Sequence, residues 1–96
     1  MSADHHPDAV AVRFMLDADP FPGLLSRLLE PFAKRDLIPD RMWSHRGDDV
    51  MHVEIAMEAM PAEMVHLVEG NLSQTVGVRS VSRKQEITGR VRRRAA

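Results

Sequence analysis

Two periodic patterns meet in the stretch Leu16–Leu25, which reads LDADPFPGLL. Before it, apolar residues alternate over Ala9–Leu16, which is typical of a half-buried strand. Pro22 is expected to be the first residue of a helix, because its missing N–H would have no partner there. That helix is predicted over residues 22–35, with an apolar stripe made of Leu25, Leu28, Leu29 and Phe32. The stretch therefore predicts a strand that enters a helix through an acidic, proline-rich loop.

The next part of the chain predicts a hairpin. A weak strand over Ile38–Arg46 contains Pro39, which favours an edge position because proline cannot donate a hydrogen bond to a neighbouring strand. The turn Arg46–Asp49 joins it to a strand over Val50–Ala59, in which apolar and polar residues alternate cleanly. These two strands are expected to pair antiparallel.

Pro61 opens a second predicted helix, whose inward face is made of Met64, Leu67, Val68 and Leu72. A last strand is predicted from Val78 to about Lys84. The order strand, helix, strand, strand, helix, strand predicts a ferredoxin-like α+β sandwich, with a four-stranded antiparallel sheet and both helices on one face. We place this domain at residues 9–85, between a disordered lead-in at 1–8 and a mobile basic tail at 86–96.

Composition limits the classes of function. A domain of 96 residues leaves apolar surface exposed unless it associates, so an oligomer is expected. The net charge of −1 argues against general affinity for nucleic acid or membranes, and the absence of cysteine excludes a thiol nucleophile. The chain has no signal-peptide pattern and no apolar run of spanning length, which predicts a cytoplasmic protein. No arrangement of nucleophile, base or paired carboxylates emerges, so no enzyme activity is expected.

Individual positions separate the families that share this topology. RNA-recognition modules need stacking aromatics on the third strand, where this chain has His52 and Glu54. The missing cysteines exclude metallochaperones, and the first loop lacks the arginine of acylphosphatases. The segment Asp19–Arg35 instead resembles the loop and first helix of the ACT domain, a small module that binds amino acids. This resemblance covers roughly Val10–Ser82.

Among ACT proteins, the chain is similar to the small regulatory subunits of acetolactate synthase (acetohydroxyacid synthase), of the short type with a single ACT domain. The shared features are the chain length, a basic segment after the last strand, Leu25-Ser26-Arg27 and Phe32–Arg35. The resemblance implies a homodimer, with two sheets joined edge to edge or packed face to face. It also implies a large catalytic subunit of a thiamine-dependent synthase as partner, and no cofactor of the chain's own.

In this family, amino-acid ligands lie between protomers, against the first loop and the start of the second strand. The resemblance therefore assigns ligand contacts to Asp19, Pro20, Pro22, Gly23, Leu24 and Ile38. Gly23 matches the family's loop glycine, and Asp19 matches in residue type. Pro20 and Ile38 depart from the family pattern, because neither side chain can hydrogen-bond an amino acid.

The residues by themselves leave two interpretations of the loop. Gly23 either lets a ligand's carboxylate approach the positive end of the helix or simply starts that helix. Asp17 and Asp19 could orient a ligand ammonium, but capping of the helix N-terminus is the favoured interpretation. Arg13 and Glu54 are expected to form a cross-strand ion pair on the sheet face away from the helices.

Trp43 is the preferred marker of a partner interface, with Arg41 and His45 on the same face of its strand, because Trp and Arg are enriched at binding hot spots. The alternative is that Trp43 packs on its own subunit. His45 and His52 are expected to approach each other across the hairpin, but structural zinc needs four ligands, so no metal site is predicted. The run Arg90–Arg94 is interpreted as a solvated tail, with contact to nucleic acid or an acidic partner as the alternative.

Three functions stay open at this point. The first is a non-catalytic ACT-domain regulatory or accessory subunit, of acetolactate synthase in branched-chain amino-acid biosynthesis, which the departures at Pro20 and Ile38 favour. The second is a free-standing ACT dimer that senses a small amino acid. The third is a structural oligomer without a ligand.

Overall fold

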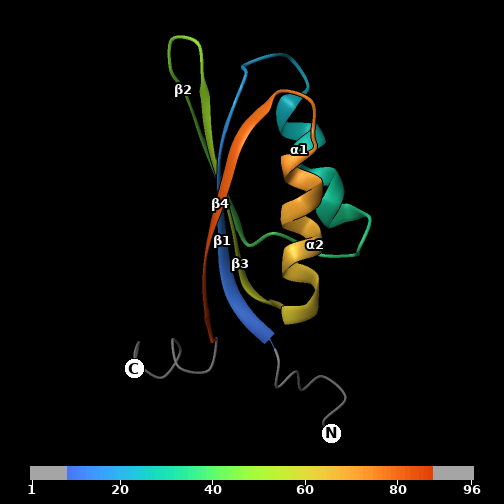
Figure 1. Cartoon of the computed structure of the whole chain (residues 1–96). Coiled ribbons are helices and arrows are strands. Elements are labelled where there is room, and N and C mark those ends of the chain that lie inside the picture. The colour runs from blue at the N-terminus through green and yellow to red at the C-terminus, as the bar shows by residue number, and fades with distance from the viewer. Residues whose placement is uncertain (1–8, 88–96) are drawn as a thin grey trace, which may run out of the picture.

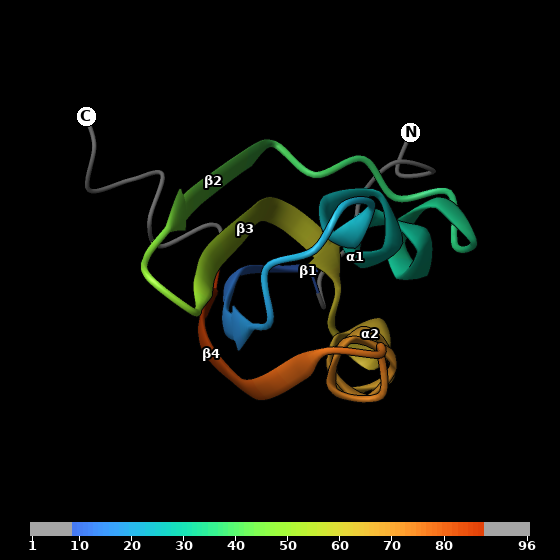
Figure 2. The same ribbon diagram turned by 90° about the horizontal axis from the view of Figure 1, so that it is seen from above.

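The computed structural model describes residues 9–87. Its elements are, in chain order, β1 (Ala9–Ala18), α1 (Leu24–Ala33), β2 (Arg41–Arg46), β3 (Met51–Pro61), α2 (Ala62–Ser73) and β4 (Val78–Ile87). The strands form one antiparallel sheet in the order β2-β3-β1-β4. Both helices lie on the same face of this curved sheet (Figure 1, Figure 2). The predicted ferredoxin-like fold is confirmed.

The core lies between the sheet and the two helices. Phe14 of β1 and Phe32 of α1 are fully buried there and meet edge to face, with ring centroids 5.8 Å apart. The other buried core residues are Val10, Val12, Leu16, Ala18, Leu24, Leu28, Val53, Ile55, Met57, Met60, Val65, Val68 and Leu72. The strand faces predicted to be apolar are therefore the faces that pack against the helices.

Helix α1 begins later than the sequence predicted. Pro22 and Gly23 form a turn, in which the Leu24 N–H donates to the Phe21 carbonyl at 3.2 Å. Gly23 precedes the helix as its N-cap, with a φ of 88°. The prediction that Pro22 is the first helical residue is wrong, because the left-handed residue after it cannot be part of a right-handed helix.

Strand β2 lies at an edge of the sheet, as predicted, but it begins at Arg41 rather than Ile38. The Asp40 N–H donates to the Ala56 carbonyl of β3 at 2.9 Å. Hydrogen bonding to β3 starts only here, because Pro39 has no N–H to donate. Ile38 consequently lies in the connection from α1, with its side chain 83% exposed.

The inward face of α2 is confirmed for Val68 and Leu72, and Met64 packs against the core. Leu67 was predicted to face inward as well, and this is wrong, because its side chain is 45% exposed. Val65 is buried instead, because it lies three positions before Val68 and therefore shares its helix face. Neither helix of the described residues is long and apolar enough to cross a membrane.

Strand β4 continues to Ile87, past its predicted end at Lys84. Its pairing with β1 extends over the whole of that strand, from Val10 opposite Ile87 to Ala18 opposite Val78. The predicted lead-in at 1–8 and the run Arg90–Arg94 lie outside the described residues.

Candidate functional site

The loop after β1 is fastened to the turn that precedes β4. The Asp19 N–H donates to the Gly77 carbonyl at 2.8 Å, and Phe21 packs against the core. Gly77 has a φ of 93°, and a Cβ atom on it would lie 2.6 Å from Cε2 of Phe21. Both the backbone conformation and the close approach therefore require glycine at this position.

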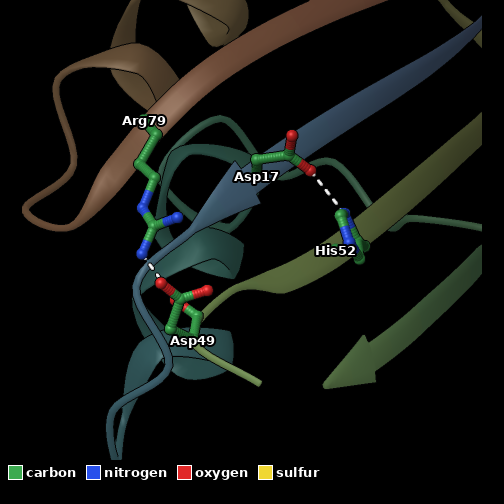
Figure 3. A network of polar contacts seen from close by, with 4 residues as sticks. All are labelled: Asp17, Asp49, His52 and Arg79. Atoms are coloured by element: carbon green, nitrogen blue, oxygen red, sulfur yellow. Dashed lines mark hydrogen bonds and ion pairs between the residues drawn. The ribbon is translucent and has the colours of Figure 1, made fainter. Parts of the chain in front are cut away.

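Arg79 clamps the same loop to the β2–β3 hairpin. Its Nε donates to Asp19 Oδ1 at 2.7 Å, and its Nη2 lies 2.7 Å from the same oxygen. Nη2 also donates to the backbone carbonyl of Asp49 at 2.5 Å (Figure 3). The register of β4 shifts between the partners of Asp17 and Ala18, which leaves Arg79 in a bulge. Bulges redirect side chains, and this one directs the guanidinium to the loop.

Neither acidic residue caps helix α1, so the capping interpretation is wrong. Asp19 pairs with Arg79, and Asp17 still belongs to β1, where its Oδ1 lies 2.6 Å from His52 Nδ1 (Figure 3). Among residues 9–87, no side chain caps the N-terminus of α1. The strand continues through Asp17, and strand alternation turns this side chain to the sheet face opposite the helices.

The start of α1 is open in front of Gly23. A Cβ atom on Gly23 would meet no described atom within 4 Å, so there is open space beside this residue, and the Leu24 N–H already donates to the Phe21 carbonyl. A carboxylate is favoured at such a position. Leu24 is buried and offers only its backbone, Pro20 is half-buried and Pro22 is exposed. Four of the six predicted ligand positions therefore lie in this loop and Leu24 begins α1, whereas Ile38 lies in a different connection.

A row of aromatic side chains crosses from β2 to β3 on the face away from the helices. The rings of Trp43 and His45 are stacked with centroids 6.0 Å apart, and those of His45 and His52 with centroids 6.4 Å apart. Arg41, Trp43 and His45 are all exposed, and Trp43 keeps 56% of its surface accessible. The predicted common face of these three residues and the approach of the two histidines are confirmed.

Two further expectations concern charged residues. The Arg13–Glu54 ion pair is confirmed, with Nη1 and Oε2 3.2 Å apart. Both side chains are partly exposed, so the pair adds little to stability. In the described part of the chain, no group of three or more His, Cys, Asp or Glu residues is placed to hold a metal ion.

Sequence reasoning did not single out Arg79. A signal was present, because an antiparallel β4 beside β1 brings an arginine near the start of β4 close to the acidic loop at the end of β1. The side chain reaches that loop only through the bulge, and no local sequence pattern reveals the bulge.

The comparisons with known proteins agree with this geometry. Residues 5–89 match the family described as ACT-like domain. The chain therefore belongs to the ACT-like domain family, whose domains are generally regulatory and sense amino acids. No curated protein matches the sequence.

Solved structures share the fold at low sequence identity. The ACT domain from GTP pyrophosphokinase of Chlorobium tepidum superposes with a TM-score of 0.68 at 12% identity, covering 79% of this chain and 99% of that one. The C-terminal domain of the MgtC protein from Mycobacterium tuberculosis gives a TM-score of 0.65 at 13% identity, covering 81% and 88%. A homoserine dehydrogenase from Thiobacillus denitrificans gives 0.71 at 17% identity, covering 88% of this chain but 19% of the dehydrogenase. These likenesses establish the fold.

Proposed function

We propose that the chain is a non-catalytic accessory or regulatory subunit that forms a homodimer and binds a larger enzyme. The proposed partner is the catalytic chain of acetolactate synthase, a thiamine-dependent enzyme of branched-chain amino-acid biosynthesis. The family membership supports a regulatory domain. The resemblance of Leu25-Ser26-Arg27 and Phe32–Arg35 to the small subunits of that enzyme supports the choice of partner.

The observation that carries an accessory role is the engagement of Asp19. Its Oδ1 accepts a hydrogen bond from Arg79 Nε at 2.7 Å and forms an ion pair with Arg79 Nη2, also at 2.7 Å. The one loop carboxylate that matches the family's ligand position is therefore already bound to a cation of its own chain. Pro20 and Ile38 offer no side-chain hydrogen bond to an amino acid. This combination favours support of a partner over ligand sensing at the loop.

The surface proposed to bind the partner consists of Arg41, Trp43 and His45 on the edge strand β2. All three are exposed, and large aromatic and arginine side chains carry a disproportionate share of binding energy at protein interfaces. The stacking of Trp43 on His45 holds the indole ring in place before binding, which reduces the entropy lost on association.

The test is a pull-down with the tagged full chain from lysate of its native cells, followed by mass spectrometry. Recovery of the synthase catalytic chain supports the proposal, and the activity of the purified catalytic chain is then measured with and without this subunit. Trp43→Ala is expected to abolish recovery. Leu67→Ala is the matched control, because Leu67 is also a large exposed apolar residue but lies on α2. Return of the bait alone contradicts the proposal.

A free-standing amino-acid sensor is the second candidate, and the open start of α1 at Gly23 favours it. Its test is a titration of the full chain with individual amino acids, followed by the amide NMR signals of the loop. Gly23→Val is a poor test, because a φ of 88° disfavours valine even without a ligand. Asp19→Asn removes the charge without this backbone strain. Ligand-dependent shifts at residues 19–24 that disappear in Asp19→Asn would favour the sensor.

A further inference from the structure

The outer edge of β2 carries backbone hydrogen-bonding groups that no described strand uses. β2 is the outermost strand on its side of the sheet and pairs only with β3 (Figure 2). The Gly47 N–H donates to the Val50 carbonyl at 2.7 Å, and hydrogen-bonded pairs alternate along an antiparallel ladder. Counting back from this pair, every second residue of β2 bonds to β3. The residues whose backbone N–H and C=O groups face the open edge are Met42, Ser44 and Arg46.

The same strand carries two cations without a partner. Arg41 and Arg46 are exposed, and they belong to none of the four ion pairs among residues 9–87. Their guanidinium groups form no hydrogen bond in that part of the chain either. Glu54, which lies opposite Trp43 on β3, is already paired with Arg13. Because β2 contains no acidic residue, the charges of its two arginines are left for a binding partner.

The opposite edge of the sheet lacks this combination. On β4, Arg79 is bound to Asp19, and Arg83 pairs with a carboxylate of α2 at 3.2 Å. The other charged residues of β4, Lys84 and Glu86, have opposite signs. A negatively charged segment is therefore attracted to the edge of β2 rather than to that of β4.

We propose that the edge of β2 binds an extended, acidic segment of the larger partner by strand addition. The segment runs antiparallel to β2 and bonds to the outward backbone groups of Met42, Ser44 and Arg46. Two carboxylates five positions apart pair with Arg41 and Arg46, and an apolar residue between them contacts Trp43, which is 56% exposed. This inference rests on the proposed function, because it takes β2 as the partner surface and specifies the chemistry of the segment that binds there.

A second copy of the chain is the alternative occupant, and the charges disfavour it. The β2 strand of a second copy brings the same two arginines and no carboxylate, so Arg41 and Arg46 gain no partner from it. An acidic segment neutralises both. Asp48 and Asp49 follow in the turn beyond Arg46, so a further carboxylate opposite this turn is repelled. The pattern of charges therefore limits the acidic positions of the segment to those opposite β2.

The probe is the synthetic peptide acetyl-TETTIVET-amide, whose two glutamates are five positions apart. In the antiparallel alignment its isoleucine faces Trp43 and its valine faces Met42. Trp43 is the only tryptophan of the chain, so its fluorescence reports binding at β2 directly. We expect a saturable change below about 5 mM peptide, a range that detects millimolar binding. Lysine in place of both glutamates is expected to weaken binding by about tenfold or more. No saturable change, or equal binding of the lysine peptide, would overturn the proposal.

Two modifications test the backbone hydrogen bonds. Methylation of the peptide nitrogen that donates to the Ser44 carbonyl is expected to weaken binding by about fivefold or more. Ser44→Pro removes the N–H on the β2 side and is expected to have a similar effect; because this N–H faces outward, the bonds to β3 are kept. Ser44→Ala is the matched control, since it keeps the N–H and should bind the peptide as the unaltered chain does. Circular dichroism checks that Ser44→Pro folds, and the methylated peptide decides if it does not. Equal binding of the methylated and plain peptides would contradict strand addition.

The charges of β2 are tested by variants of the chain. Arg41→Gln and Arg46→Gln should each weaken peptide binding about twofold to fivefold, because exposed ion pairs contribute modestly. Lys84→Gln is the control, since this cation lies on β4, and it should leave the affinity unchanged. Equal affinity of both arginine variants and the unaltered chain would refute the acidic chemistry of the segment.

The outcomes separate this inference from the accessory role. Peptide binding without recovery of the synthase in the pull-down would support the strand-addition site and reject the proposed partner. Recovery of the synthase by the unaltered chain and equally by Ser44→Pro would support that partner and reject strand addition. Sedimentation covers the second-copy alternative. If the peptide does not bind and Ser44→Pro separates a dimer into monomers, the edge joins two copies of the chain and the proposal is wrong.

Discussion

Replacing Gly77 with alanine tests whether the first loop is positioned by its contact with the turn before β4. The substitution adds a Cβ atom 2.6 Å from Cε2 of Phe21, closer than the 3.4 Å at which ordinary contact begins. It also places a non-glycine residue at a φ of 93°. Phe21 and the backbone of the loop must both shift to accept alanine.

The two effects together predict a large loss of stability. A left-handed conformation costs a non-glycine residue about 1–2 kcal/mol, and overpacking by one methyl group costs about 1–3 kcal/mol. We therefore expect the free energy of unfolding to fall by roughly 2–5 kcal/mol. For a domain of this size, the corresponding fall in Tm is on the order of 10–30 °C.

Urea unfolding followed by circular dichroism measures this loss, with two companion variants. Gly70→Ala is the matched control, because its Cβ atom would meet nothing within 4 Å and the site lies inside α2. It should stabilise the chain by about 0.5–1 kcal/mol. Adding Phe21→Leu to Gly77→Ala should restore the part of the unfolding free energy that overpacking removes. The strain of alanine at a positive φ should remain. A Gly77→Ala variant within about 1 kcal/mol of the unaltered chain would refute the reasoning.

Four other substitutions test separate parts of the structure. Phe32→Ala should cost about 3–5 kcal/mol in urea unfolding, because the ring is fully buried against Phe14; a loss below about 2 kcal/mol would contradict this packing. Asp36→Gly should raise the unfolding free energy by about 0.5 kcal/mol, since Asp36 has a φ of 56°, and a fall would contradict it. Trp43→Ala should change the free energy of unfolding by less than about 0.5 kcal/mol, yet weaken binding of the proposed catalytic chain in sedimentation experiments, and unchanged binding would place the partner contact elsewhere. Arg79→Gln should cost at most about 1 kcal/mol because the pair is exposed, while the amide signal of the residue it clamps, Asp19, should shift; an unmoved signal would argue against the clamp.

The fold was predictable because its signals are local and repeated. Strand β3 alternates cleanly between apolar and polar residues, β1 alternates large apolar residues with smaller or polar ones, and these are the two central strands of the sheet. Each has one face against the helices, so alternation reports burial directly. The edge position of β2 was predicted from Pro39, which lies just before the strand and has no N–H to donate to a neighbouring strand. Each of these elements is therefore determined by residues that are close to one another in the sequence.

The site was less predictable because its contacts are made by residues that are far apart in the sequence. Pro-Gly is compatible with a helix that starts at Pro22 and with a turn before the helix, and the docking of Phe21 beside Gly77 favours the turn. The partner of Asp19 depends on a bulge in β4, which shifts one side chain by a single register position. Local patterns carry no information about either contact. The local sequence made helix capping the plausible role for Asp19, whereas in the structure Asp19 pairs with Arg79.

The contact between Arg79 and Asp19 bears on whether an amino acid can bind at the loop. At the loop, the Arg79 guanidinium occupies Asp19 Oδ1 and is held there by the sheet at a high effective concentration, so an incoming ammonium either competes for that oxygen or contacts Oδ2. Because the guanidinium already neutralises the Asp19 carboxylate, a ligand ammonium gains less there than at an unpaired carboxylate, which favours the accessory role over sensing at the loop.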